Sequence, residues 1–112
     1  MLIWQKAHLL VIEIYSITNI FPESEKFNLT SQIKRAITSV PTNIVEGHDR
    51  SSANEFLRFL YISRGSLEEV RHLLLLSKDL KYIDEQIYKR VESNCAEISI
   101  MINKLIKSIK DC

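Results

Sequence analysis

Residues 31–50 read SQIKRAITSVPTNIVEGHDR and combine a helical apolar pattern with a proline inside the same run. Four apolar residues recur every three or four positions, the spacing of one helix face: Ile33, Ile37, Val40 and Ile44. Pro41 has no amide to bond the Ile37 carbonyl, and its ring pushes that carbonyl away. We therefore predict one helix with a kink at Pro41.

The bounds of this helix follow from the residues at its two ends. It is predicted to begin near Leu29 or Thr30 and to run to Glu46, with Gly47 as its C-terminal stop. Asn28, just before it, is predicted to take a left-handed conformation, which asparagine tolerates better than most residues.

A polar stripe follows one flank of the same helix: Gln32, Arg35, Ser39, Asn43 and Glu46. One interpretation is that the kink aims Glu46 and Arg50 at a partner. The other is that the bend wraps the helix around its own bundle, while the stripe packs at a subunit contact; we adopt this second interpretation. The hydroxyl of Thr38 or Ser39 is expected to satisfy backbone groups that the proline frees.

Three more segments have helical periodicity. The first runs from about Ile3 to Asn19 and ends before Phe21-Pro22, because a residue that precedes proline avoids the helical region. The next begins at the capping box Ser52-Ala53-Asn54-Glu55 and runs to about Leu80. In that box the Ser52 hydroxyl accepts the Glu55 amide and the Glu55 carboxylate reaches back to the Ser52 amide.

The last segment begins after Asp84, which is predicted to be its N-cap. Its seam positions alternate in steps of three and four, the pattern of a bundle: Ile87, Val91, Cys95 or Asn94, Ile98, Ile102, Leu105 and Ile109. Residues 1–112 contain only two Gly and two Pro, too few for the turns of a β fold. We predict a single all-α domain, an antiparallel up-down-up-down four-helix bundle.

The helices carry more apolar residues than one bundle interior holds. Leu73 to Leu76 cover most of the circumference of their helix, and Ile100 and Ile106 lie off the predicted seam. Exposed apolar faces indicate a partner surface. We therefore predict a homo-oligomer.

The formal net charge is only +1, so any nucleic-acid-binding surface requires local segregation of charge. The candidate nucleic-acid-binding residues fall in three clusters: Lys34 and Arg35, Arg50 and Arg58, and Lys104, Lys107 and Lys110. For the last cluster the alternative is that the lysines complement the dipole at a helix C-terminus.

No motif for catalysis, metal or cofactor binding stands out. The metal candidates are scattered: His8, His48, His72, Cys95 and Cys112. Glu68 and His72 have helical spacing and are interpreted as a surface pair. Glu46 with His48 or Arg50 is interpreted as a capping and ion-pair group rather than an acid–base pair. We expect no enzyme activity, no cofactor and no small-molecule substrate.

We expect the protein to be in the reducing cytoplasm and not to be inserted in a membrane. Cys95 and Cys112 would lie about 25 Å apart on one helix, which argues against a disulfide between them. No apolar stretch approaches the roughly 18 residues of a membrane span, and no signal-peptide pattern opens the chain.

The central run resembles the signature of the 23S rRNA intervening-sequence protein family. The residues that carry the resemblance and are expected to be structural are Arg35, Pro41, Asn43, Glu46, Gly47 and Arg50. The resemblance extends over almost the whole chain, through Trp4, Phe21-Pro22, Phe56 and Gly65-Ser66-Leu67.

The resemblance implies a small bacterial bundle that assembles as a homopentamer. A related branch comprises the accessory proteins of diversity-generating retroelements, which bind a reverse transcriptase and nucleic acid. The combined hypothesis is a non-enzymatic oligomeric adaptor or scaffold for RNA, DNA or a nucleic-acid enzyme. The alternatives are a structural oligomer that binds another protein, or an enzyme with Glu46 and Arg50 at a subunit boundary.

Overall fold

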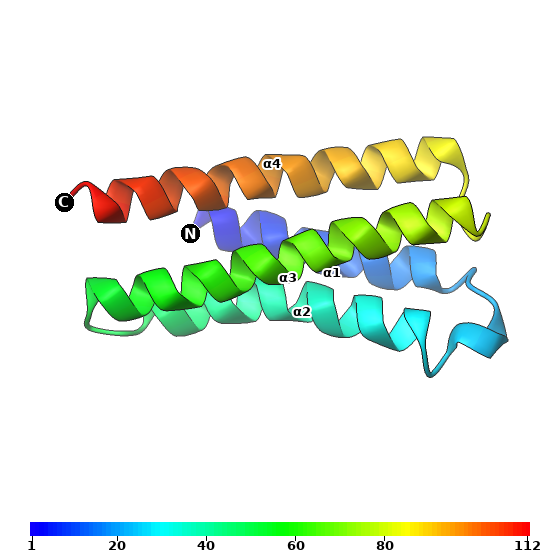
Figure 1. Cartoon of the computed structure of the whole chain (residues 1–112), viewed down its shortest axis with the longest axis horizontal. Helices are drawn as coiled ribbons and strands as arrows, with labels where there is room; N and C mark the ends of the chain where they lie inside the picture. Colours follow the sequence, from blue (N-terminus) through cyan, green and yellow to red (C-terminus); the bar gives the residue numbers. More distant parts are fainter.

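The computed structural model describes residues 1–112 and contains four α-helices and one short 3₁₀ helix, with no strand (Figure 1). The elements are α1 (Leu2–Thr18), η1 (Glu23–Glu25), α2 (Leu29–His48), α3 (Ala53–Asp79) and α4 (Glu85–Lys110). The molecule is elongated, with extents of 46 × 25 × 19 Å. The predicted all-α fold is confirmed.

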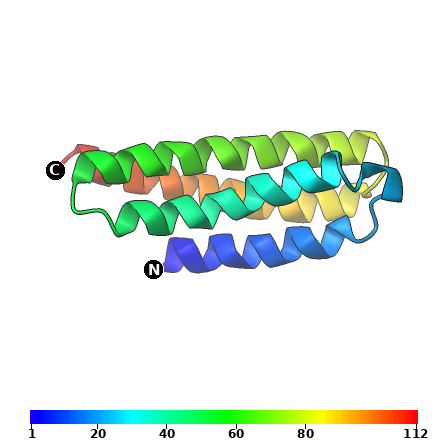
Figure 2. The same ribbon diagram turned by 90° about the horizontal axis from the view of Figure 1, so that it is seen from below.

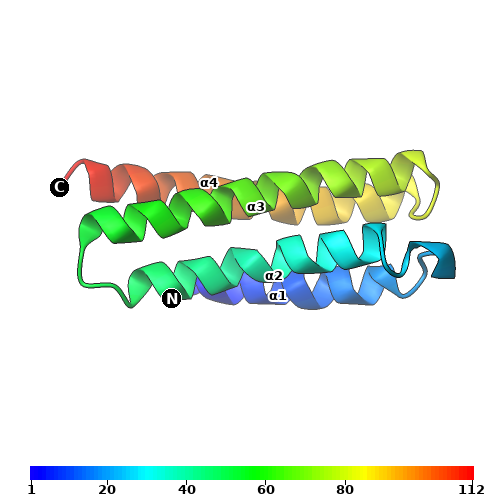
Figure 3. The same ribbon diagram turned by 60° about the horizontal axis from the view of Figure 1, so that its bottom comes forward.

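Neighbouring helices run antiparallel, and α1 lies against α4 to close the bundle (Figure 2). The contact between α2 and α3 is the most extensive of the helix pairs, and that between α1 and α4 is the least. The α1–α2 and α3–α4 connections lie at one end of the bundle and the α2–α3 connection lies at the other (Figure 3). None of the helices combines the length and the hydropathy needed to cross a membrane.

The interior is one cluster of 23 buried apolar residues drawn mainly from the four helices. On α4 the buried seam follows Val91, Cys95, Ile98 and Ile102, as predicted, but then passes to Ile106. The predicted continuation through Leu105 and Ile109 is wrong, since both residues are only partly buried. A straight helix repeats every 3.6 residues, so a strict seven-residue repeat drifts off the core over several turns.

The two predicted N-caps are confirmed. The Ser52 hydroxyl accepts a hydrogen bond from the Glu55 amide at 3.2 Å, although the return bond of the capping box is not formed. The Asp84 carboxylate accepts one from the Ile87 amide at 2.7 Å. Each bond satisfies one of the free amides in the first turn of its helix.

The predicted C-terminal signal at Gly47 is wrong, because α2 continues to His48 and no glycine has a positive φ. Asn28 is not left-handed either, with φ −128° and ψ −102°. The left-handed residue is Lys81, with φ 67°, just past the end of α3. The amides of Lys81 and Tyr82 there bond back to the carbonyls of Lys78 and Ser77, both at 2.9 Å.

Gly47 is required for helix packing instead. A Cβ atom at this position would lie 2.7 Å from Cβ of Phe59 and 2.9 Å from Cδ1 of Phe56. The missing side chain therefore lets the end of α2 approach the start of α3. This is a contact between distant segments, which a local sequence pattern does not reveal.

Small polar residues continue this close α2–α3 contact toward the middle of the bundle. The hydroxyls of Ser39 and Ser66 are 2.8 Å apart, and the Asn43 amide donates to Ser39 at 2.8 Å. The buried Ser63 hydroxyl donates to the Val40 carbonyl at 2.9 Å. Ser39 and Asn43 of the polar stripe thus pack within the chain, while the subunit contact of the stripe stays a prediction.

Helix α2 runs without interruption through Pro41, whose side chain is buried. The Thr38 hydroxyl bonds the carbonyls of Lys34 and Arg35, both at 3.0 Å. The expectation that Thr38 or Ser39 compensates at Ile37 is therefore wrong, because each hydroxyl has another partner. The kink itself stays a prediction.

Candidate functional site

Three of the helix termini meet at one end of the bundle. Because the helices alternate in direction, the C-termini of α2 and α4 and the N-terminus of α3 lie together (Figure 1). This arrangement brings five of the seven candidate cations to the same end: Arg50, Arg58, Lys104, Lys107 and Lys110. We call these five residues the basic end.

Arg50 and Arg58 share one aromatic support. Their guanidinium carbons lie 5.0 and 4.6 Å from the centre of the Phe59 ring. The Cβ of Phe59 is in turn the atom nearest to the site of the missing side chain of Gly47. The close α2–α3 packing thus positions the ring against which both arginines rest.

The α4 lysines lie at the same end of the bundle as this pair. Arg64 donates to Asn103 across the α3–α4 boundary at 3.2 Å, which fixes the register of these antiparallel helices. Arg58 lies six residues before Arg64 on α3, and Ile109 lies six residues after Asn103 on α4. Because the two helices are antiparallel, both steps lead toward the same end, and Lys110 is therefore close to the axial level of Arg58. All three lysines of the basic end are exposed, and none forms an ion pair.

Acidic residues share this end of the bundle: Glu46, Asp49, Glu55 and Asp111. Glu46 lies 3.4 Å from Arg50 and partly neutralises it, while both groups stay exposed. The excess of positive charge is therefore carried mainly by Arg58 and the α4 lysines.

The predicted cluster of Lys34 and Arg35 lies apart from the basic end. Thirteen residues of α2 separate Arg35 from the end of the helix at His48, which is about 20 Å, and Arg50 lies beyond that end. The Lys34 ammonium lies over the ring of Tyr15 from α1, at 4.8 Å from its centre. The predicted clusters therefore do not form one continuous surface.

The residues considered for metal binding are dispersed, and no group of three or more His, Cys, Asp or Glu is placed to hold an ion. His8 stacks on Trp4 at 5.2 Å, and His48 meets the edge of Phe56. Cys95 is buried in the core, and this burial raises the pKa of its thiol to about 12.

The sequence suggested that Glu68 pairs with His72, but this pair is not formed. Glu68 lies 3.2 Å from Arg71, which also holds Glu92 of α4 at 2.6 Å. The hydrogen bond to Glu92 raises the pKa of Arg71. Arg71 therefore joins α3 to α4 through carboxylates on both helices.

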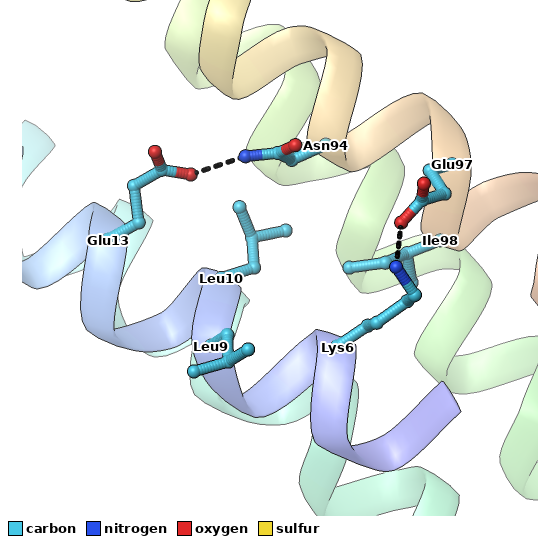
Figure 4. Close-up of a pocket in the computed structure, with 7 residues that line it drawn as sticks. All are labelled: Lys6, Leu9, Leu10, Glu13, Asn94, Glu97 and Ile98. Atoms are coloured by element: carbon cyan, nitrogen blue, oxygen red, sulfur yellow. Dashed lines mark hydrogen bonds and ion pairs between the residues drawn. The ribbon is translucent and has the colours of Figure 1, made fainter. Parts of the chain in front are cut away.

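A groove of about 290 Å³ lies between α1 and α4 (Figure 4). Its polar side chains bond one another across the gap, with Lys6 at 2.7 Å from Glu97 and Asn94 at 2.8 Å from Glu13. Arg90 also reaches Glu13, at 3.0 Å. These groups are used to join the helices, which leaves the groove without a free set of polar groups for a ligand.

A second groove, of about 480 Å³, lies between α1 and α2 beside Pro41. Sequence reasoning missed it, although Trp4 and His8 have the spacing of one helix face. It is lined by eight residues: Trp4, His8, Val11, Thr38, Pro41, Thr42, Val45 and Glu46. The groove is mainly apolar, in contrast to the one between α1 and α4.

Residues 1–104 match the family model described as 23S rRNA-intervening sequence protein. The chain belongs to this family. The solved structures include a protein of unknown function from the S23 ribosomal protein family of Bacteroides thetaiotaomicron, similar at a TM-score of 0.87 and 24% identity. The alignment covers 94% of this chain and 98% of that protein, and it supports the fold. A sequence search gave no match among curated proteins.

The residues that suggested the family are these: Arg35, Pro41, Asn43, Glu46, Gly47 and Arg50. In the structure Asn43 bonds the Ser39 carbonyl at 2.8 Å, and Gly47 admits the α3 aromatics. Glu46 and Arg50 form an exposed ion pair. Several members of this 23S rRNA-intervening sequence protein signature therefore shape the α2–α3 packing and the end of α2.

Proposed function

We propose that this chain is a non-enzymatic, homo-oligomeric scaffold that binds nucleic acid, or a nucleic-acid-processing partner, through the basic end. The observation that carries the proposal is the convergence of five exposed cations from the α2–α3 connection, α3 and α4 at one end of the bundle. Phosphate groups are the ligands that such exposed cations favour. The same residues are spread over sixty positions of the sequence.

Self-association is supported by the apolar side chains that the bundle leaves uncovered. The most exposed lie on α1, on α4 and around the α1–α2 connection: Leu2, Leu9, Ile12, Ile20, Phe27 and Ile100. Burying such residues between copies removes apolar surface from water. The family resemblance implies a pentamer, and a mass measurement in solution tests that number.

Assembly also strengthens weak electrostatic binding. One basic end carries five cations close to four carboxylates, so a single subunit is expected to bind phosphates weakly. Several copies held together present several basic ends to one nucleic acid, and the effective concentration of the later contacts rises.

The test is a titration of the protein against structured RNA and duplex DNA at two salt concentrations. Each phosphate contact releases counterions, so genuine binding is expected to weaken steeply as salt rises. The substitutions K107E and K110E are expected to weaken binding, and K104E added to them is expected to weaken it further.

The matched control reverses two exposed lysines at the opposite end, K81E and K89E, which changes the net charge by the same amount. Equal loss of affinity in both pairs would show a general charge effect and would count against the basic end. Absence of binding at low salt would favour the second candidate, a structural oligomer that binds another protein through its exposed apolar residues.

A further inference from the structure

Phe27 is the least covered large apolar side chain of the molecule, with 90% of its surface exposed. It lies in the turn between η1 and α2, at the end opposite to the basic end. The ammonium of the adjacent Lys26 lies over its ring, at 5.5 Å from the ring centre. The phenyl ring therefore projects from the fold without packing against the core.

The groove between α1 and α2 has the complementary shape and chemistry. Its volume of about 480 Å³ is ample for a phenyl ring. The rings of Trp4 and His8 both line it and stack on each other, with 5.2 Å between their centres and 10° between their planes. Pro41 and Val45 provide an apolar wall on the α2 side, where the proline has no amide that needs a partner.

Phe27 does not reach the groove of its own chain. Pro41 and Val45 are fourteen and eighteen residues further along, and α2 is a continuous helix between them and the turn. At 1.5 Å per residue the groove lies about 20 Å from the Phe27 turn. An occupant that presents Phe27 to this groove therefore belongs to another copy of the chain.

Each surface carries one charge of opposite sign to the other. Lys26, next to Phe27, lies 3.8 Å from Glu23, and Glu46, which lines the groove, lies 3.4 Å from Arg50. Both are exposed ion pairs of little strength, so Lys26 and Glu46 can exchange these partners for each other. We propose that Phe27 of one copy inserts into the α1–α2 groove of a second copy, with Lys26 facing Glu46. The proposal rests on the self-association proposed above and specifies the contact through which it occurs.

The contact joins two different surfaces, so each copy offers one projecting ring and one groove. It is either repeated in both directions within a twofold dimer or propagated from copy to copy around a ring. In both cases a copy that lacks only the ring still offers an intact groove, and a copy that lacks only the groove still offers an intact ring.

The test compares the oligomeric masses of F27D, V45D and a control, I62D, by sedimentation equilibrium. Ile62 is an apolar residue of α3 with 43% exposure, and it lines neither surface. F27D and V45D are expected to raise the dissociation constant of the assembly about thirtyfold, the loss of one central anchor. I62D is expected to leave it unchanged. Far-UV circular dichroism checks folding, and the exposed Phe27 makes F27D decisive even if V45D folds poorly.

Mixing the two variants gives the sharper result. F27D and V45D are each expected to be largely monomeric alone and to form a one-to-one complex together, because one intact ring then meets one intact groove. Absence of that complex would overturn the proposal. Wild-type protein that assembles while F27D assembles equally well would overturn this contact alone, whereas a monomeric wild type would overturn both the contact and the proposed self-association.

Discussion

Replacement of Gly47 by alanine is expected to destabilise the bundle although alanine is the better helix former. The added methyl carbon would lie 2.7 Å from Cβ of Phe59 and 3.3 Å from the carbonyl oxygen of Phe56. Neither atom is the flexible end of a long side chain. The start of α3 must therefore move away from α2, which weakens the packing around both aromatic residues.

The size of the effect follows from two opposing terms. Overpacking of a close contact costs about 1–3 kcal/mol. The change from glycine to alanine in a helix returns about 1 kcal/mol, and less near a helix end such as this one. The expected net loss in the free energy of unfolding is about 1–2 kcal/mol, or about 1 M in the urea midpoint.

The chain provides a matched control in its other glycine. Gly65 lies in the interior of α3, and nothing is within 4 Å of the position that its Cβ would take. G65A is therefore expected to stabilise the protein by up to about 1 kcal/mol. Urea unfolding followed by circular dichroism, at equal protein concentrations, measures both. G47A as stable as G65A would refute the close-packing account of Gly47.

Three further predictions concern the proline, the buried thiol and a helix cap. P41A is expected to give a straighter α2 and an altered oligomeric mass with unchanged helicity; an unaltered mass and stability would make the proline incidental. The Cys95 thiol, whose pKa is raised from 9.0 to about 12, keeps its proton in the folded state, so its stabilising effect is complete below pH 9 and is lost as pH rises toward 12. C95V is expected to show a smaller decline in the free energy of unfolding over that range, and an identical decline would contradict the assignment. S52A removes the bond to the Glu55 amide and is expected to cost about 1 kcal/mol, whereas the neighbouring S51A is expected to have little effect in the same urea assay.

Local patterns in the sequence predicted the helices and their N-termini well. Ser52 and Asp84 act on amides three residues away, so their hydrogen bonds depend on nothing outside one helical turn. The apolar spacing likewise identified Ile33, Ile37 and Ile44 as buried. The repeat of apolar residues along one helix is enough to predict that these residues are buried.

The errors concern residues whose role depends on a distant segment. A glycine at this position is typical of a helix end, but Gly47 is needed because a side chain there would collide with Phe59 of the next helix. Ser39 lies on a polar stripe, yet its hydroxyl meets Ser66. The sequence also could not predict that the residues of the basic end lie together, because only the packing of α3 on α4 brings Arg58 level with Lys110.

The α1–α4 boundary has a consequence for local motion. It is the least extensive contact between neighbouring helices, and Lys6–Glu97 and Arg90–Glu13 bridge it with partly exposed side chains. Exposed ion pairs contribute little in water and are screened by salt. Helix α1 is therefore expected to be the first cooperative unit to detach, with its amide hydrogens exchanging faster than those of the α2–α3 pair, and faster still as ionic strength rises.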